Sequence, residues 1–494
     1  MTTNVGATLA VAHSGSPLQK QTRERAVIFV FACAAIASGI FTAAFSLPSA
    51  ATVATIAFFV FAGFVLPRAW IPIALAILIP FQFYISFAGA LNLRGATLFV
   101  FAAGLRLLIE RGLSRKWSRW YAWMIPAALF LLAATVSAIG AANRYAAFKG
   151  IYDWLPVFAA AFVVSESLRA ENWLKRLLVV LSLCGIAQAV LGLVQSRFSL
   201  SQAIDWMRLP WIGIFSQPNV VRDRLEDFSF NWILDGRVLP FGTFINDIDF
   251  AVFMAAALAL ILGLLLASRR AGELIAWTIG AAAVVVALGL TFKGSGMIAL
   301  AGVSAIMLTF VIRRFDARVA LLVLVLSAVI SVAALFFFDS IGQRILYLVQ
   351  RELGLVSVSG RSAIWAHLLT HLPERWGFGF GLNNADWLVD PLPSARGGEF
   401  IFAIPAAESA YIAALIETGL VGFGALIAFL GAVLARAIEG MRTSVTPAWR
   451  VGILAALVAI VLGNLTVVGL TSDQIGILFG VLIGMVFAGT HGRT

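Results

Sequence analysis

The sequence predicts an all-α integral membrane protein, a polytopic helical bundle of about 12–14 transmembrane helices with a large, partly helical outer loop. Hydrophobic residues make up 61% of the 494 residues, whereas charged residues make up only 12%. The mean hydropathy is +0.97. Because one soluble core cannot bury that much apolar surface, the chain requires lipid. Two long polar segments, 197–237 and 339–405, interrupt the apolar pattern, and loops of such length favour a binding role.

About fourteen apolar windows approach the length needed to span a bilayer. They lie near 26–45, 51–66, 69–88, 95–109, 121–141, 151–165, 177–195, 240–266, 274–292, 296–312, 318–338, 407–435, 450–469 and 474–489. Windows 51–66, 95–109 and 151–165 are shorter than the roughly 20 residues of a straight crossing, which indicates tilted, partial or re-entrant helices.

These windows divide the chain into six regions. The regions are a cytoplasmic tail (1–25), N-terminal transmembrane helices (26–195), an outer interfacial loop (196–239), core transmembrane helices (240–338), a large periplasmic loop (339–406) and C-terminal transmembrane helices (407–494). The first apolar window follows a polar stretch with Lys20, Arg23 and Arg25, so we expect it to act as an anchor and not as a cleaved signal peptide.

Basic residues cluster in alternate short loops. The clusters are Arg68; Arg111, Arg115, Lys116 and Arg119; Arg169, Lys175 and Arg176; Arg269 and Arg270; Arg313, Arg314 and Arg318; and Arg436, Arg442 and Arg450. The positive-inside rule assigns these loops to the cytoplasm, so we expect both termini inside and both long polar loops outside. The net charge of +11 is then an orientation signal and does not indicate nucleic acid binding.

Several basic residues remain on the outer side, where topology does not account for them. They either contact anionic lipid headgroups and nearby carboxylates or bind substrate. Arg237, Lys293 and Arg361 fit a clamp for pyrophosphate best, because they lie where loops join helices. A guanidinium fork binds phosphate oxygens in a bidentate manner.

Four stretches within residues 235–435 carry a family resemblance. They are Arg237–Asp247 (RVLPFGTFIND), Leu290–Gly296 (LTFKGSG), Ser359–Trp365 (SGRSAIW) followed by Gly377–Gly381 (GFGFG), and Glu408–Gly422 (ESAYIAALIETGLVG). In this order they resemble motifs of the bacterial O-antigen ligase and O-antigen polymerase superfamily. The second stretch departs from that pattern, since Lys293-Gly294 stands where the family usually has Ser-Arg.

The resemblance implies a multispanning glycosyltransferase of the bacterial inner membrane, with its active site facing the periplasm. Such enzymes take a glycan from undecaprenyl diphosphate without a metal ion, a nucleotide sugar or another cofactor. A polymerase joins lipid-linked repeat units into O-antigen, capsule or exopolysaccharide, whereas a ligase transfers the glycan to lipid A-core. The implied partners are undecaprenyl-diphosphate-linked glycan and membrane lipid, with no nucleic acid, and a chain-length-regulating co-polymerase stays open.

The position of the catalytic base separates the polymerase from the ligase. The resemblance implies a histidine in ligases at the start of the helix after the large loop, where this chain has Glu408. We therefore expect a polymerase in which Glu408 activates the acceptor hydroxyl and Arg361 binds the diphosphate. The alternative role of Glu408 is to cap the helix, in which case Asp247 or Asp249 becomes the base. Glu417 is expected to pair within the bundle.

Three further residues are expected to contact substrate: Trp365, Tyr411 and His367. His367 and His371 have the i, i+4 spacing of a two-histidine metal site, but no second cluster of ligands follows, so we expect no metal.

A transporter or flippase of a lipid-linked sugar is the alternative from another class. The chain has no evident repeat between its halves and little charge in mid-membrane, which disfavours it.

Overall fold

The computed structural model describes most of the membrane-embedded chain. The described residues are 48–81, 84–87, 91–113, 121–168, 170–199, 202, 233–234, 237–244, 247–291, 293–314, 360–388, 407–441 and 448–488. The expected tail (1–25) and the expected spans at 26–45 and 318–338 lie outside these residues. The side chains of Arg237 and Arg361 also lie outside the description, although their backbones are included.

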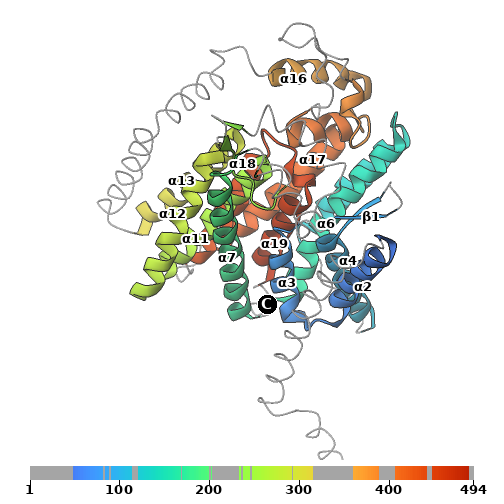
Figure 1. The fold of residues 1–494 in the computed structure, drawn as a ribbon. Coiled ribbons are helices and arrows are strands. Elements are labelled where there is room, and N and C mark those ends of the chain that lie inside the picture. The colour runs from blue at the N-terminus through green and yellow to red at the C-terminus, as the bar shows by residue number, and fades with distance from the viewer. Residues whose placement is uncertain are drawn as a thin grey trace, which may run out of the picture.

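Helices dominate the described residues, which confirms the expected all-α membrane fold (Figure 1). They are α2 (Pro48–Val65), η2 (Arg68–Trp70), α3 (Ile71–Leu78), α4 (Gly95–Leu113), α5 (Met124–Ile139), α6 (Arg144–Ser167), α7 (Glu171–Gln195), α11 (Asp247–Ala267), α12 (Ala271–Thr291), α13 (Gly294–Arg314), α16 (Gly360–His371), η3 (Leu372–Arg375), η4 (Ala385–Leu388), α17 (Ala410–Glu439), α18 (Trp449–Gly463), η5 (Gly469–Thr471) and α19 (Asp473–Ala488). Two short antiparallel hairpins join them: β1 (Tyr84–Phe87) with β2 (Leu91–Arg94), and β3 (Ile233–Leu234) with β4 (Arg237–Val238).

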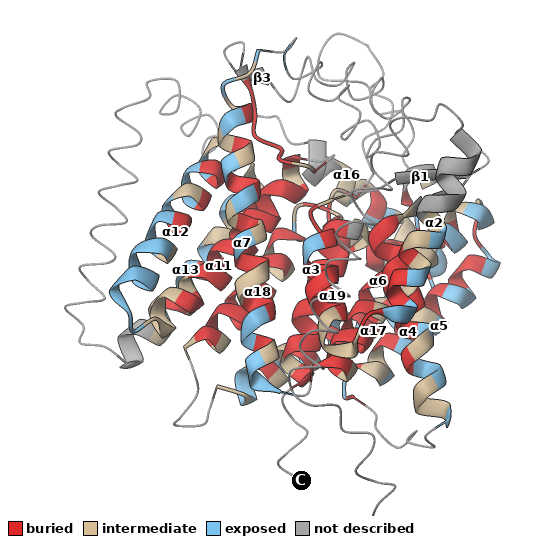
Figure 2. Cartoon of the chain, turned by 60° about the horizontal axis from the view of Figure 1, so that its bottom comes forward, coloured by how far each residue is buried: buried red, intermediate tan, exposed pale blue. Residues whose placement is uncertain are grey.

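Within the described residues, 5 helices are long and apolar enough to cross a membrane, namely α6, α7, α11, α12 and α17. Helices α11 and α19 are enclosed by their neighbours, whereas α12 leaves much of its surface uncovered (Figure 2). An apolar helix with an uncovered face fits a position at the lipid boundary, and a helix that is apolar on all sides fits the centre of a bundle. The composition of each helix thus agrees with its depth in the bundle.

Residues 69–88 differ from the continuous span that their hydrophobicity predicts. Helix α3 ends at Leu78, shortly before Pro80, and the chain continues into the β1–β2 hairpin. Proline lacks an N–H and disfavours helix at the preceding residue. The carbonyl of Pro80 accepts hydrogen bonds from the Thr243 hydroxyl and, at 2.8 Å, from Gln474 Nε2. Side chains from distant segments therefore satisfy the backbone where the helix stops.

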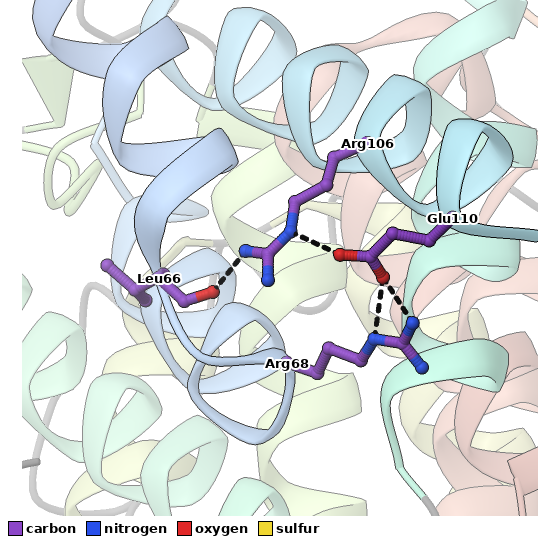
Figure 3. A network of polar contacts seen from close by, with 4 residues as sticks. All are labelled: Leu66, Arg68, Arg106 and Glu110. Carbon is purple, nitrogen blue, oxygen red and sulfur yellow. Dashed lines mark hydrogen bonds and ion pairs between the residues drawn. The ribbon is translucent and has the colours of Figure 1, made fainter. Parts of the chain in front are cut away.

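One end of the bundle, here called the basic end, is joined by ion pairs between helix termini. In Figure 3, Glu110 near the end of α4 accepts hydrogen bonds from Arg68 Nε at 2.8 Å and Arg106 Nε at 2.9 Å. Arg106 also donates to the carbonyl of Leu66. Glu166 at the end of α6 accepts from Tyr121 at 3.0 Å and pairs with Arg111 at 3.3 Å in the same way. Helix α16 lies at the opposite end, here called the loop end (Figure 1).

Helix α17 is broken at Gly419, and the glycine-rich segment Gly377–Gly381 fills the break. The N–H groups of Leu420 and Val421 donate to the carbonyls of Trp376 and Gly377, at 2.8 and 3.1 Å. In return, the carbonyls of Ile416 and Glu417 accept from the N–H groups of Phe380 and Gly381, at 3.1 and 2.8 Å. The hydrogen bonds that the helix loses are thus replaced by four bonds to the loop, so the broken backbone stays paired.

Glycine is required on both sides of this contact. Gly419 has φ 64° and Gly379 has φ 70°, in the left-handed region that favours glycine. A Cβ at Gly419 would lie 2.4 Å from the carbonyl carbon of Gly377, and one at Gly379 would lie 2.5 Å from that of Glu417. The two backbones can approach this closely only without side chains.

The same loop is also attached to the corner between α5 and α6. Asn384 accepts from the N–H of Asn143 at 2.8 Å and donates to its carbonyl at 3.1 Å. Arg375 donates to the carbonyl of Gly140, and the Ser137 hydroxyl donates to that of Glu417 at 2.6 Å. Residues 375–384 therefore connect the N-terminal helices to α17.

We expect Gly419→Ala to destabilise the protein, because alanine would have to adopt a left-handed backbone and its methyl group would collide with Gly377. The cost is on the order of 1–3 kcal/mol. Thermal unfolding of the variant in lipid nanodiscs should show a lower midpoint than the wild type. Gly424→Ala is the matched control, since a Cβ at that position of α17 meets no atom within 4 Å. Equal midpoints for the two variants would refute the role given to Gly419.

Candidate functional site

The starts of α11 and α17 flank the connection between α18 and α19. The N–H of Ala410, the first residue of α17, donates to the carbonyls of Asn464 at 3.1 Å and Val467 at 3.0 Å. On the α11 side, a Cβ at Gly469 would lie 3.3 Å from Asp249 Oδ1, so this carboxylate packs against the connection. Candidate residues that are more than 150 positions apart in the sequence are therefore attached to one short segment.

Asp247 and Lys293 form an ion pair in this region, with 2.7 Å between Oδ2 and Nζ. The Asp247 side chain is 4% exposed and the Lys293 side chain is 21% exposed. Asp247 also begins α11, where a carboxylate is stabilised by the helix dipole. Removing one partner of such a pair leaves a buried charge, so the two residues depend on each other.

Lys293 also begins α13. Its carbonyl accepts a hydrogen bond from the N–H of Met297 at 3.2 Å, which is the first bond of that helix. The ammonium group therefore lies beside the positive end of a helix dipole. A helix start and a lysine together favour binding of an anion, which the carboxylate of Asp247 already provides within the protein.

Glu408 lies directly before α17, and its neighbour Ser409 caps the helix. The hydroxyl oxygen of Ser409 accepts from the N–H of Ile412 at 3.5 Å. The N-cap role considered for Glu408 therefore belongs to Ser409. Glu408 is half-buried and has φ 37°, and among the described residues only Asn383 shares a positive φ without being glycine. A glutamate in this region is strained.

Trp365, His367 and Tyr411 each use their polar atom to bind backbone. The indole N–H of Trp365 donates to the carbonyl of Ala407, and the Tyr411 hydroxyl donates to that of Val461 at 2.7 Å. His367 Nε2 lies 3.0 Å from the carbonyl of Leu388, so it must carry the proton. These contacts attach α16 and the start of α17 to their surroundings. A role of the three residues in binding substrate stays a prediction.

The histidine pair is engaged in other contacts. The rings of His367 and His371 meet edge to face at 5.1 Å, and His371 Nδ1 lies 2.9 Å from Glu374. In the described part of the chain, no group of three or more His, Cys, Asp or Glu residues is placed to hold a metal ion.

Glu417 contacts the loop with both its backbone and its side chain. The side-chain Oε1 accepts from the N–H of Ala385 at 3.3 Å, and the carbonyl accepts from Gly381 and Ser137. We expected this residue to pair within the bundle, and its partners come from the loop as well as from α5. The buried carboxylate helps to hold the loop segment 381–385 against α17.

Sequence reasoning missed the buried amides that shape this region. Gln195 Oε1 accepts from the N–H of Gly242 at 2.7 Å, and Gln188 Oε1 accepts from that of Thr243 at 3.0 Å. They hold the turn within the Arg237–Asp247 stretch, and for this reason the core helix begins at Asp247 and not near residue 240. The signal was present, because two glutamines spaced by seven residues share one face of an apolar helix.

Asn464 is a further residue that the sequence analysis did not single out. It is fully buried. Its Oδ1 accepts from the N–H of Leu470 at 2.8 Å, and its Nδ2 donates to the carbonyl of Ile460 at 2.8 Å. This residue thus holds the turn to which the starts of α11 and α17 are attached.

Two predicted ligands are placed by their backbones only. Arg237 lies in β4, before the glutamine-bound turn, and Arg361 is the second residue of α16. Their side chains lie outside the described residues, so the clamp of Arg237, Lys293 and Arg361 stays a prediction.

Comparison with known proteins identifies part of the chain. Residues 279–427 match the family model described as O-antigen ligase. A search of curated proteins finds no match. The matched segment runs from α12 into α17 and contains Lys293, Arg361 and Glu408, whereas the Arg237–Asp247 stretch precedes it. The resemblance inferred from the motifs is confirmed: this membrane protein carries a domain of the O-antigen ligase and polymerase superfamily.

Proposed function

We propose that the protein is a glycan polymerase that transfers undecaprenyl-diphosphate-linked repeat units onto one another at the periplasmic face of the inner membrane. Its product would be O-antigen, capsule or exopolysaccharide. The observation that carries the proposal is the attachment of α11 and α17 to one segment: it relates Glu408 to the Asp247–Lys293 pair within a chain that carries the family's domain.

The proposed reaction requires a stabilised leaving group. The acceptor hydroxyl oxygen attacks the anomeric carbon of the donor glycan, and the bond from that carbon to the diphosphate oxygen breaks. The electron pair leaves with the lipid diphosphate, whose growing negative charge fixed cations stabilise. We assign this task to Arg361, with Arg237 and Lys293 as further cations. No metal ion is needed if these three groups surround the diphosphate.

The acceptor proton requires a base, and we assign this role to Glu408. Strained backbone at a residue that does not cap its own helix is a feature of functional sites. A carboxylate in place of the histidine that the family resemblance implies for ligases supports the polymerase over the ligase. Trp365, Tyr411 and His367 are proposed to contact the sugars through their ring faces and edges, since their polar atoms bind backbone.

The arrangement of charge supports the proposed orientation. Arg68, Arg106 and Arg111 are attached to carboxylates at the basic end, as the positive-inside rule requires of a cytoplasmic face. The loop end, with α16, then faces the periplasm, where lipid-linked glycans are joined.

We expect Glu408→Gln to abolish polymer formation, because glutamine keeps the size and the hydrogen bonds of the side chain but cannot accept the proton. Single lipid-linked repeat units should accumulate at normal protein levels, as measured by extraction of lipid-linked oligosaccharides from cells. Glu374→Gln is the control, since this exposed glutamate of the same loop pairs only with its neighbour His371 among the described residues. Continued synthesis of polymer would move the base to Asp247 or Asp249. Accumulation of long lipid-linked polymer would instead favour the ligase.

We expect Arg361→Lys to lower polymer yield strongly, because lysine keeps the charge but loses the bidentate fork. A loss of roughly tenfold or more corresponds to one charge-assisted hydrogen bond to the leaving group. The yield is measured at matched protein levels. Arg270→Lys serves as the control, because that side chain is 86% exposed in the short turn between α11 and α12. Full activity of Arg361→Lys would remove Arg361 from the diphosphate site.

A further inference from the structure

We propose that the start of α13 binds one phosphoryl group of the lipid diphosphate through Lys293 and Ser295, and that Asp247 competes with that phosphoryl group for Lys293. This inference rests on the proposed function and deepens it. The α13 anion site is defined as the ammonium of Lys293, the hydroxyl of Ser295 and the first backbone N–H groups of α13.

The first part of the argument concerns the helix start. The first N–H groups of a helix have no carbonyl partner within the helix, and a Ser, Thr, Asp or Asn side chain usually accepts from them. In α13 the residue at the N-cap is Lys293, whose ammonium has no acceptor. The amides of this 21-residue helix are therefore not capped by the side chain that precedes them.

The second part concerns Ser295. Its side chain is buried, with the residue 4% exposed, and its Oγ has no hydrogen-bond partner among the described residues. Ser268, Thr278 and Thr309, in or next to the neighbouring helices, each donate to the carbonyl four residues earlier, at 2.8, 2.8 and 2.7 Å. Ser295 lies in the first turn of its helix, where that carbonyl is out of reach. A buried hydroxyl without a partner is costly, so Ser295 is poised to donate to a ligand.

The third part concerns the side on which a ligand can lie. A Cβ at Gly296 would lie 2.8 Å from Ala251 Cβ, so the third residue of α13 is packed against α11. Lys293 and Gly294, by contrast, are only half-buried. A ligand can therefore reach the helix start over residues 293–295. Ammonium, hydroxyl and amide donors around a helix start match the oxygens of a phosphoryl group.

The ion pair adds the competition. Asp247 Oδ2 lies 2.7 Å from Lys293 Nζ, the distance at which a phosphoryl oxygen would bind. A diphosphate group that binds here must displace this carboxylate oxygen or share the ammonium with it. Competition of this kind lowers the affinity for the lipid diphosphate and speeds its release. Release of the product carrier is a step that limits turnover in many enzymes.

The experiment measures binding of farnesyl diphosphate, a short prenyl diphosphate, to the full-length protein in lipid nanodiscs by titration calorimetry. Ser295→Ala should weaken binding by roughly tenfold, the effect of losing one hydrogen bond to a charged group. Ser182→Ala is the matched control and should bind as the wild type. Ser182 is also a buried serine without a hydrogen-bond partner among the described residues, but it lies inside α7.

Asp247→Asn decides whether the carboxylate competes. The amide keeps the shape of the side chain but removes its charge, so we expect tighter binding and slower dissociation of farnesyl diphosphate. Weaker binding would mean that Asp247 orients Lys293 and would overturn the competition. Where the Asp247→Asn variant does not fold, the comparison of Ser295→Ala with Ser182→Ala still decides whether α13 binds the diphosphate.

The outcomes separate the inference from the proposed function. Wild-type protein that binds no farnesyl diphosphate would overturn both the α13 anion site and the proposed donor. Wild-type binding that neither Ser295→Ala nor Asp247→Asn changes would overturn the α13 anion site alone.

Discussion

The hydrogen bonds between the broken helix α17 and the segment Gly377–Gly381 determine much of the architecture. A membrane has no water to satisfy free backbone groups, so a transmembrane helix can break only where protein replaces the lost bonds. The loop supplies these bonds and is attached through Asn384 to the corner between α5 and α6. The contact thereby positions the first part of α17, including Glu408, relative to the N-terminal helices. A site at the loop end depends on this pairing of backbones.

Much of the fold could be predicted, because long apolar windows have few alternatives to a membrane helix. The windows at 177–195, 274–292 and 407–435 correspond to α7, α12 and α17. The window at 69–88 misled because hydrophobicity averages over Pro80, although proline decides where the helix stops. The break at Gly419 was also not predicted, since a glycine within an apolar run is typical of close helix packing. The partner of Gly419 is distant in sequence, so local pattern alone could not reveal the break.

The candidate site shows the same division. The chemistry of Asp247, Lys293 and Glu408 could be recognised from residue type and position, and the structure pairs the first two. Buried amides such as Gln188, Gln195 and Asn464 were not singled out, because their partners are backbone groups of other segments. The glycine-rich run, expected to belong to a binding loop, has a structural role in the backbone contact with α17. Aromatic and histidine side chains likewise hold α16 in place through their polar atoms.

The glycine-rich contact has a consequence for biosynthesis. Residues 376–381 leave the ribosome before residues 416–421, so the loop is made before the helix whose backbone it completes. When α17 first enters the bilayer, its own backbone can satisfy every hydrogen bond only as a continuous helix. The break at Gly419 must then form by exchange of helical bonds for loop bonds. Maturation of the protein therefore includes a rearrangement after insertion, and a mispaired loop would leave a correctly inserted but inactive chain.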